Sequence, residues 1–366
     1  MVVSVQDLDT PCLLIDQQRL AVNIARMQAL ADRHGVKLRP HIKTHKMPVL
    51  ALTQIEAGAI GVAVATLGEA ETMAAAGITN IQIASQVVGA AKYHRLAHLR
   101  RQITLSCAVD SIDHVRELSA FFATQGLTLE LLIEVDTGLH RCGVADVDAA
   151  LALAREIERL PALRFRGVMT HAGHAYAAVG PDDVARIGRE EGERMVALAE
   201  QLRASGLTVD TVSVGSTPTA RHAAAVAGVT ELRVGNYIFN DMMQVSLGSA
   251  SLDQCAMSVL STVISTPTAD RAVIDAGAKA LALDRGAHGN STLHGYGLVR
   301  EKDCTISRLS EEHGIIDECG GCFVRGEKVS IIPNHACAVV NLFDYAYLVD
   351  GGTVVDTLPV TARGRA

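Results

Sequence analysis

The sequence predicts an α/β fold in which an N-terminal (β/α)8 barrel is followed by a C-terminal domain made mostly of β-strands. Up to about residue 244, short and continuously apolar runs alternate with helical stretches, a pattern typical of parallel strands buried on both faces. Eight such units indicate a barrel, and a doubly wound open sheet is the structural alternative. After residue 244, apolar runs follow one another across Gly-rich turns without helices between them, which indicates a β domain.

The individual elements follow in chain order. A short buried strand is expected over 12–16, and an amphipathic helix follows, with Leu20, Ile24, Met27, Leu30 and Ala31 at helical spacing. The eight candidate barrel strands are 37–43, 61–66, 81–85, 104–110, 130–136, 164–171, 211–216 and 231–237, and helical stretches such as 67–76, 111–125 and 181–205 lie between them. Candidate strands of the second part are 259–265, 271–275, 328–332, 338–341 and 346–349. We therefore expect a barrel over 17–244 and a β domain over 245–366, completed by residues 1–16.

Composition narrows the class of protein. The chain has 366 residues, of which 49% are hydrophobic and 20% charged, so it can bury a large core. A net charge of -7 without a block of lysine or arginine argues against a nucleic-acid partner. No apolar run approaches the roughly 18 residues that cross a membrane. The first ten residues show no export signal and the eight cysteines are scattered, so we expect a cytoplasmic protein.

The stretch with the densest chemistry is residues 39–46, Arg-Pro-His-Ile-Lys-Thr-His-Lys. Two lysines and two histidines fall within six residues, directly after Pro40 and at the end of the first candidate barrel strand. A lysine with a lowered pKa at a barrel mouth can form a Schiff base with an aldehyde cofactor. A basic surface turn is the alternative that the octapeptide alone leaves open.

Polar clusters also follow four other candidate strands, at the end of a barrel where active sites lie. The fifth strand ends near Glu134 and is followed by Arg141, and the sixth runs into His171, His174 and Tyr176. The seventh and eighth end in small or hydroxylated residues whose amides suit a phosphate, namely Gly215, Ser216, Thr217, Gly235 and Asn236. Each cluster is weak alone, since Gly-Ser-Thr-Pro is usually only a turn, but five clusters at five strand ends together indicate an active site.

These segments resemble the D-threonine aldolase and D-serine dehydratase group. The similarity rests on Pro-His-Ile-Lys-Thr-His-Lys at 40–46, Asp-Thr-Pro at 9–11 and Gly-Ser-Thr-Pro at 215–218, and extends to Asp-Ala-Gly at 275–277 and Glu-His-Gly at 312–314. Members of this group are pyridoxal 5′-phosphate (PLP) enzymes with an alanine-racemase-like fold. The resemblance implies a PLP-binding barrel, a metal site in the β domain and, by family analogy, a homodimer.

The resemblance also implies roles for individual residues. Lys43 would hold the cofactor aldehyde, with Lys46 the less favoured anchor, and Arg141 would lie beside the phenolic oxygen of PLP or the substrate carboxylate. Arg233 would be directed at the pyridine nitrogen, although a surface salt bridge is its alternative. The complete cofactor site would comprise His41, Lys43, Arg141, Tyr176, Gly215, Ser216, Thr217, Arg233, Gly235, Asn236 and Tyr237.

A divalent metal is expected at His335 and Cys337. If this segment is a strand, the two side chains share one face, and imidazole with thiolate favours zinc, with manganese as a further possibility. A lone His-x-Cys is usually packing, but the resemblance implies a metal here. The competing interpretation is a closed structural zinc site that adds Cys319 and Cys322.

The reaction implied is a lyase reaction on a β-hydroxy-D-amino acid. Members that eliminate water tend to carry His-x-Cys, as here, and the aldolases tend to carry His-x-Asp, so we expect dehydration to a 2-keto acid and ammonia. The sixth strand end also departs from the Tyr-His-Gly pattern of the aldolases. In the aldolase alternative, His171 or His174 would deprotonate the β-hydroxyl, giving glycine and an aldehyde. A racemase or a non-catalytic PLP-binding protein would leave the His335/Cys337 pair without a role.

Overall fold

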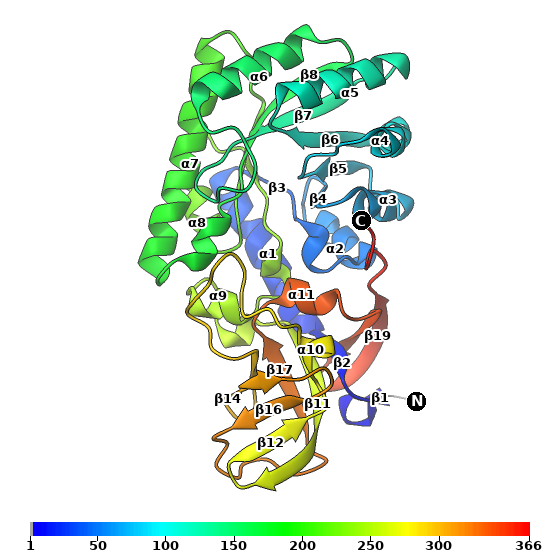
Figure 1. Ribbon diagram of the computed structural model, residues 1–366, viewed down its shortest axis with the longest axis vertical. Helices are drawn as coiled ribbons and strands as arrows, with labels where there is room; N and C mark the ends of the chain where they lie inside the picture. Colours follow the sequence, from blue (N-terminus) through cyan, green and yellow to red (C-terminus); the bar gives the residue numbers. More distant parts are fainter. Residues whose placement is uncertain (1–2) are drawn as a thin grey trace.

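The first sheet of the molecule is a closed parallel barrel (Figure 1). In the computed structural model, which describes residues 3–366, its strands pair in the order β3-β10-β9-β8-β7-β6-β5-β4, all in parallel. A parallel bridge from His41 to Ala63 closes the ring, and the Ala63 amide donates to the Pro40 carbonyl at 2.8 Å. The strands are β3 (Lys37–Leu38), β4 (Val62–Val64), β5 (Asn80–Ile83), β6 (Thr104–Val109), β7 (Leu129–Glu134), β8 (Leu163–Met169), β9 (Thr211–Val214) and β10 (Glu231–Leu232). The predicted barrel is confirmed, and the doubly wound open sheet is excluded.

The first and last barrel strands end earlier than the sequence predicts. β3 stops before Pro40, which has no amide hydrogen to donate, and the chain then turns into a 3-10 helix, η2 (Ile42–Thr44). β10 likewise gives way to η4 (Asn236–Ile238). The two turns touch, since a Cβ on Gly235 would lie 2.9 Å from the His41 carbonyl oxygen. Residues at the ends of these predicted strands, such as His41 and Gly235, line the main cavity of the molecule.

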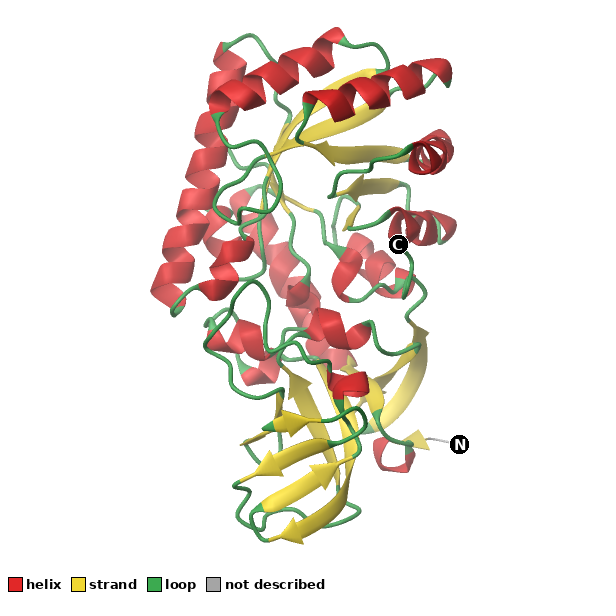
Figure 2. Ribbon diagram, viewed as in Figure 1, coloured by secondary structure: helices red, strands yellow, loops and turns green. Residues whose placement is uncertain are grey.

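Helices cover the outside of the barrel (Figure 2). They are α1 (Gln17–His34), α2 (Pro48–Glu56), α3 (Leu67–Ala75), α4 (Ala90–Gln102), α5 (Ile112–Thr124), α6 (Val147–Arg159), α7 (Pro181–Ala204) and α8 (Ala220–Ala223). α1 begins where the Asp16 carboxylate accepts a hydrogen bond from the Arg19 amide at 2.9 Å, and it ends at Gly35, whose φ is 65°. The helices predicted over 67–76, 111–125 and 181–205 are confirmed as α3, α5 and α7.

The second sheet combines strands from both ends of the chain. β2 (Cys12–Asp16) pairs antiparallel with β11 (Met257–Thr268) and parallel with β18 (Tyr345–Asp350). The other strands are β1 (Val3–Ser4), β12 (Arg271–Ile274), β13 (Gly297–Val299), β14 (Cys304–Thr305), β15 (Arg308–Leu309), β16 (Gly314–Asp317), β17 (Lys328–Pro333) and β19 (Thr353–Pro359). Strands predicted at 259–265, 271–275, 328–332 and 346–349 correspond to β11, β12, β17 and β18. Short helices α9 (Met242–Ser246) and α10 (Ala278–Leu281) connect the sheet to the barrel and to its own loops.

The strand predicted at 338–341 is wrong. This segment belongs to helix α11 (Ala336–Val340). His335 keeps an extended backbone, but the Ala336 amide donates to the buried carboxylate of Asp241 at 2.8 Å, and the chain turns into a helix at that point. Its small and apolar side chains pack inward, with Ala336 and Val340 fully buried. His335 and Cys337 therefore lie at a strand-to-helix junction and not on one face of a strand.

The barrel core is apolar, as continuous runs of apolar residues require. Side chains such as Ile81, Leu105, Ile133 and Val212 are fully buried. This burial is expected of parallel strands whose two faces are both covered. Over residues 3–366, no helix has the length and apolar character needed to pass through a bilayer.

Candidate active site

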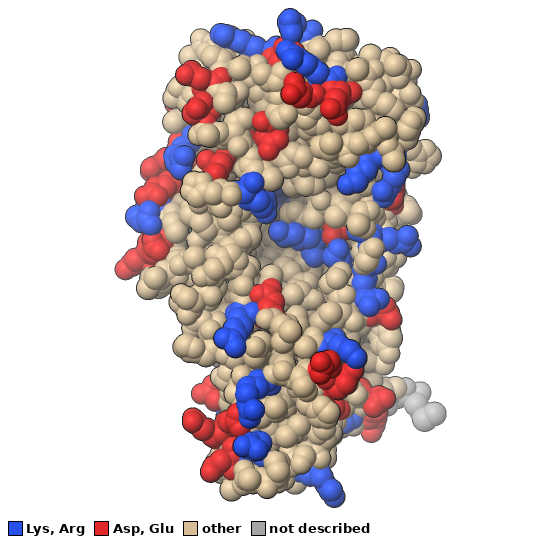
Figure 3. All heavy atoms as spheres, viewed as in Figure 1, with Lys and Arg blue, Asp and Glu red and all other residues tan. Residues whose placement is uncertain are grey.

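The main cavity lies at the C-terminal ends of the barrel strands, beside the second sheet. It has a volume of about 460 Å³ and appears in Figure 3 as a hollow with lysine and arginine side chains around it. Of the residues that the sequence singles out, it is lined by His41, Lys43, Arg141, His171, Tyr176, Ser216, Thr217, Arg233, Gly235, Asn236, His335 and Cys337. His174, Gly215 and Tyr237 do not line it. The fold thus brings segments nearly three hundred residues apart into one site.

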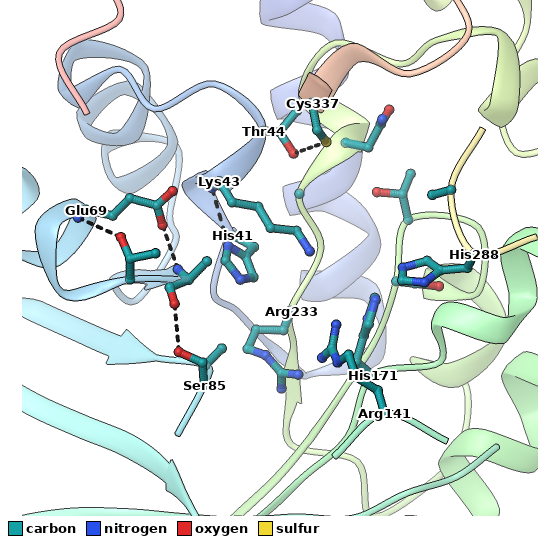
Figure 4. Close-up of a pocket in the computed structure, with 18 of the residues that line it drawn as sticks. His41, Lys43, Thr44, Glu69, Ser85, Arg141, His171, Arg233, His288 and Cys337 are labelled. Carbon is teal, nitrogen blue, oxygen red and sulfur yellow. Dashed lines mark hydrogen bonds between the residues drawn. The ribbon is translucent and has the colours of Figure 1, made fainter. Parts of the chain in front are cut away.

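Lys43 extends into the middle of this cavity (Figure 4). Its segment is shaped by His41, whose Nδ1 accepts a hydrogen bond from the Lys43 amide at 3.4 Å. Burial lowers the pKa of the Lys43 ammonium, and nearby Arg141 lowers it further, against an opposing effect of Cys337. Within residues 3–366 its Nζ makes no ion pair, whereas Lys46 Nζ is bound to the buried Glu69 carboxylate at 2.7 Å. Lys43 is therefore the lysine free to react with an aldehyde.

Backbone amides gather on one side of Lys43, where the seventh and eighth strands end. The amides of Thr217, Gly235 and Asn236 donate to no other residue in the described part of the chain. The loop is held from behind, because the buried Glu191 carboxylate accepts hydrogen bonds from the Gly215 amide at 2.7 Å and from Thr219 Oγ1 at 2.9 Å. Free amides at a helix start favour a dianion. This cluster, the phosphate cradle, fits the phosphate of PLP.

Arg233 forms the base of the cavity. Its Nη1 donates to Ser213 Oγ at 2.7 Å and its Nη2 donates to the Thr170 carbonyl at 2.6 Å, which fixes the guanidinium. The side chain is buried, so the expectation of a surface salt bridge does not hold. Burial lowers the pKa of Arg233, and neighbouring glutamates, Glu231 first, oppose that effect. A fixed guanidinium at this depth can donate to a ring nitrogen of a bound cofactor.

Arg141 and Tyr237 lie at the periphery of the site. Arg141 follows β7, is about half exposed, and its Nη2 lies 3.5 Å from the Glu134 carboxylate. Glu134 also accepts a hydrogen bond from Gln86 Nε2 at 2.6 Å. Tyr237 is buried behind the phosphate cradle, where its amide donates to Thr217 Oγ1 at 3.1 Å and its hydroxyl accepts from Gln54. Tyr237 thus supports the cradle and does not reach the cavity.

Three aromatic side chains form the opposite wall. The His171 ring lies 5.8 Å from that of His288, and the His288 ring lies 5.7 Å from that of Tyr176. Burial, followed by the charges of Lys43 and Arg141, lowers the pKa of His171 well below its ordinary value, which favours the neutral imidazole. Its Nε2 is buried with no partner in residues 3–366, and its Nδ1 approaches the Gly215 carbonyl at 3.4 Å. His174 instead lies against Gly138, outside the cavity.

His335 and Cys337 enter the cavity from the second sheet. His335 Nδ1 is 2.5 Å from Asp284 Oδ2, which leaves Nε2 for another partner. The Cys337 thiol lies 3.2 Å from Thr44 Oγ1. Burial raises the pKa of Cys337, but His335, Lys43 and Thr44 outweigh it, so the pKa is lowered and the thiolate favoured. An imidazole held by a carboxylate, beside a thiolate, fits a zinc-type cation.

The closed structural zinc site is not formed. Within residues 3–366, no three His, Cys, Asp or Glu side chains are arranged to hold a metal ion. Cys319 lies in the second sheet against the Ala269 carbonyl, at the Gly320-Gly321 turn. Cys319 and Cys322 therefore do not join His335 and Cys337 in one ligand set.

Several residues at the site are absent from the sequence-based prediction, among them Asp284 and His288. Asp284 and His288 belong to the loop between α10 and β13, which crosses to the barrel. Asn290 Nδ2 of this loop donates to the Tyr176 carbonyl at 2.9 Å. The only sequence signal is a run of glycine and polar residues, Asp-Arg-Gly-Ala-His-Gly-Asn at 284–290, with no strand period.

A free lysine at a barrel mouth, facing a phosphate cradle and a buried arginine, defines a PLP enzyme of the alanine-racemase-like fold. Residues 15–242 match the family model of the alanine racemase N-terminal domain, and residues 256–349 match that of a putative serine dehydratase domain. D-threo-3-hydroxyaspartate dehydratase of Delftia sp. is 39% identical over 366 residues, covering 95% of this chain and 96% of that protein.

Solved structures agree with this match. D-threonine aldolase from Filomicrobium marinum superposes with a TM-score of 0.92 at 32% identity, over 100% of this chain and 98% of that one. A metal-free cysteine-to-alanine mutant of D-threo-3-hydroxyaspartate dehydratase gives a TM-score of 0.90 at 37% identity, with both chains fully covered. The chain belongs to the D-threonine aldolase and D-serine dehydratase family, and it is a PLP-dependent lyase acting on D-amino acids.

Proposed function

We propose that this chain is a metal-dependent dehydratase that converts β-hydroxy-D-amino acids to 2-keto acids and ammonia. The observation that carries the proposal is the His335/Cys337 pair, which lines the same cavity as the free amine of Lys43. The pair combines a thiol whose pKa is lowered with an imidazole oriented by Asp284. A cysteine-to-alanine mutant of D-threo-3-hydroxyaspartate dehydratase, 37% identical to this chain, is described as a metal-free form, which supports a role for a metal in this family.

Different residues of the cavity would bind the cofactor and the metal. Lys43 would hold the PLP aldehyde, the phosphate cradle its phosphate, and Arg233 its ring nitrogen, while His335 and Cys337 would hold a divalent metal, with zinc favoured. When bound, PLP supplies an electron sink and the metal supplies a Lewis acid. Burial lowers the pKa of Lys43, which favours its uncharged form, and the free amine would accept the α-proton of the substrate at Nζ.

Two histidines beside Lys43, His41 and His171, have lowered pKa values. Burial and the charge of Lys43 lower the pKa of His41 well below its ordinary value. The lowered pKa values of His41 and His171 disfavour a positive charge on either ring, and such a charge would raise the cost of protonating Lys43 Nζ during turnover. Proton transfer of this kind contributes about 10²–10⁴-fold to a rate.

The aldolase reaction is the second candidate, and the position of His171 in the cavity favours it. Its imidazole has a lowered pKa, lines the cavity and has a buried Nε2 without a partner in residues 3–366. Such a nitrogen could accept the proton of a β-hydroxyl, which would lead to cleavage of the Cα–Cβ bond. The thiol at Cys337 argues for the dehydratase, since the aldolases of the family tend to carry aspartate there.

Removal of the metal should stop the release of ammonia. We expect dialysis of the PLP-loaded protein against a chelator, in buffer that holds PLP in excess, to abolish ammonia release from D-threonine and D-serine, and zinc to restore it, while the absorbance of bound PLP stays unchanged. The measurement is ammonia by a coupled assay, before and after addition of zinc or manganese. Full activity after metal removal, verified by elemental analysis, would contradict the proposal.

A further inference from the structure

Asp241 is a fully buried carboxylate that lies between the phosphate cradle and the metal pair without lining the cavity. Its Oδ2 accepts two hydrogen bonds, from Asn236 Nδ2 at 2.5 Å and from the Ala336 amide at 2.8 Å. Its Oδ1 accepts one from the Gln244 amide at 3.1 Å, which caps helix α9. The helix cap therefore accounts for only one of the two oxygens.

The two partners of Oδ2 belong to opposite sides of the site. Asn236 begins η4, and its amide is one of the free amides of the phosphate cradle. Ala336 stands between His335 and Cys337, so its amide fixes the backbone that carries both side chains. A single carboxylate oxygen thus connects the residue that would hold the PLP phosphate to the two residues that would hold the metal.

A second contact from the same segment reaches the loop that orients His335. The amide of Met243, in α9, donates to the Asn334 carbonyl at 3.2 Å. Asn334 Nδ2 in turn donates to the carbonyls of Arg285 and Gly295 at 3.2 and 3.0 Å, at the two ends of the loop with Asp284. Asp241 and helix α9 therefore contact the backbone between His335 and Cys337 directly, and they contact the loop that carries Asp284 through Asn334.

Burying a carboxylate is costly unless it is paired or hydrogen-bonded. Among residues 3–366, Asp241 has no cationic partner within 4.0 Å, so it depends on its three N–H donors. An apolar residue with a different cap would avoid this cost. The arrangement is accounted for if the link between the two sides of the site has a function.

We propose that Asp241 is a positioning residue that couples occupancy of the phosphate cradle to the affinity of the His335/Cys337 pair for metal. A phosphate bound at the cradle restrains Asn236, and Asp241 Oδ2 transmits that restraint to the Ala336 amide and to the spacing of the two ligands. Binding of PLP then tightens binding of the metal, and the metal tightens binding of PLP by the same factor. The inference rests on the proposed metal pair.

The test measures zinc affinity with and without PLP. Zinc is titrated against a chromophoric chelator in apo-protein and in PLP-saturated protein, with PLP binding followed by its absorbance. For the natural chain we expect PLP to tighten zinc binding by about 5- to 150-fold, the usual range of coupling between two sites. In Asp241→Asn the factor should fall to about one, and zinc affinity of the PLP-bound form should fall by about 10- to 100-fold.

Two further variants keep the test decisive. Asn236→Ala removes one partner of Oδ2 and leaves Asp241 and the metal pair in place, so it should lose the coupling while zinc affinity of the apo-protein is retained. It decides the matter if Asp241→Asn does not fold. Asp275→Asn is the matched control, because Asp275 also accepts from Thr10 Oγ1, Ser261 Oγ and the Thr262 amide at 2.5, 2.6 and 2.9 Å, away from the cavity. It should keep the coupling.

The outcomes separate this inference from the proposed function. Coupling that is absent in the natural chain, or retained within about twofold in Asp241→Asn or Asn236→Ala, overturns the role of Asp241. Zinc binding that is strong, but independent of PLP, contradicts only this inference. A natural chain that binds no zinc or manganese contradicts the proposed function as well.

Discussion

Lys43→Ala is expected to abolish the absorbance band of the lysine–PLP Schiff base and to lower turnover by about 10⁴-fold or more. The lysine would serve twice, as the anchor of the aldehyde and as the base that accepts the α-proton. Its Nζ has no ion pair within residues 3–366, and burial lowers its pKa, which favours the uncharged amine. The measurement is the visible spectrum of the PLP-loaded variant, together with its rate on D-threonine.

Lys46→Ala is the matched control, since it removes the neighbouring lysine of the same octapeptide. Lys46 is bound to Glu69 at 2.7 Å, so its loss should leave the Schiff-base band intact even if the unpaired carboxylate costs stability. Borohydride reduction of the natural chain, followed by peptide mass analysis, should place the reduced cofactor on Lys43. A band that survives in Lys43→Ala, or a label on Lys46, would refute the assignment.

The second large effect is expected from the metal pair. His335→Ala and Cys337→Ala should each remove the bound metal and most of the activity, while the Schiff-base band remains. Loss of a group that only supports a ligand costs about 10- to 100-fold in metal affinity, and loss of a ligand should cost more. The measurement is metal content by elemental analysis after dialysis, beside the PLP absorbance of the same sample.

Cys319→Ser and Cys322→Ser serve as controls for the cysteines of the second sheet. Cys319 lies against Ala269 and outside the cavity, so both variants should keep the metal. Equal metal content in the natural chain and in Cys337→Ala would exclude Cys337 as a ligand. Metal loss in Cys319→Ser would instead require a site other than the one described.

The barrel and the centre of the site could be predicted from the sequence because they depend on local pattern. Continuous apolar runs gave the eight parallel strands, and strand ends converge at one end of a barrel whatever the side chains. The residues at these ends, such as Lys43, Ser216 and Arg233, are therefore brought together by topology alone.

The parts that escaped prediction depend on tertiary contacts. Ala336–Val340 is a short run of small and β-branched residues that suits a strand or a helix, and the buried carboxylate of Asp241 decides for the helix. Asp284 and His288 lie on an irregular loop without period. His174 is three residues from His171, but the 3-10 turn η3 (Gly173–Ala177) directs it away from the cavity.

The identity of the carbon product from D-threonine tests the central claim most directly. The PLP-loaded, zinc-loaded protein is incubated with D-threonine, and the products are separated by chromatography, with Lys43→Ala as the blank. We predict 2-oxobutyrate and ammonia in equal amounts, since the His335/Cys337 pair lines the cavity of Lys43. Glycine and acetaldehyde would contradict the dehydratase and assign the chain to the aldolases, with His171 as the base to test next.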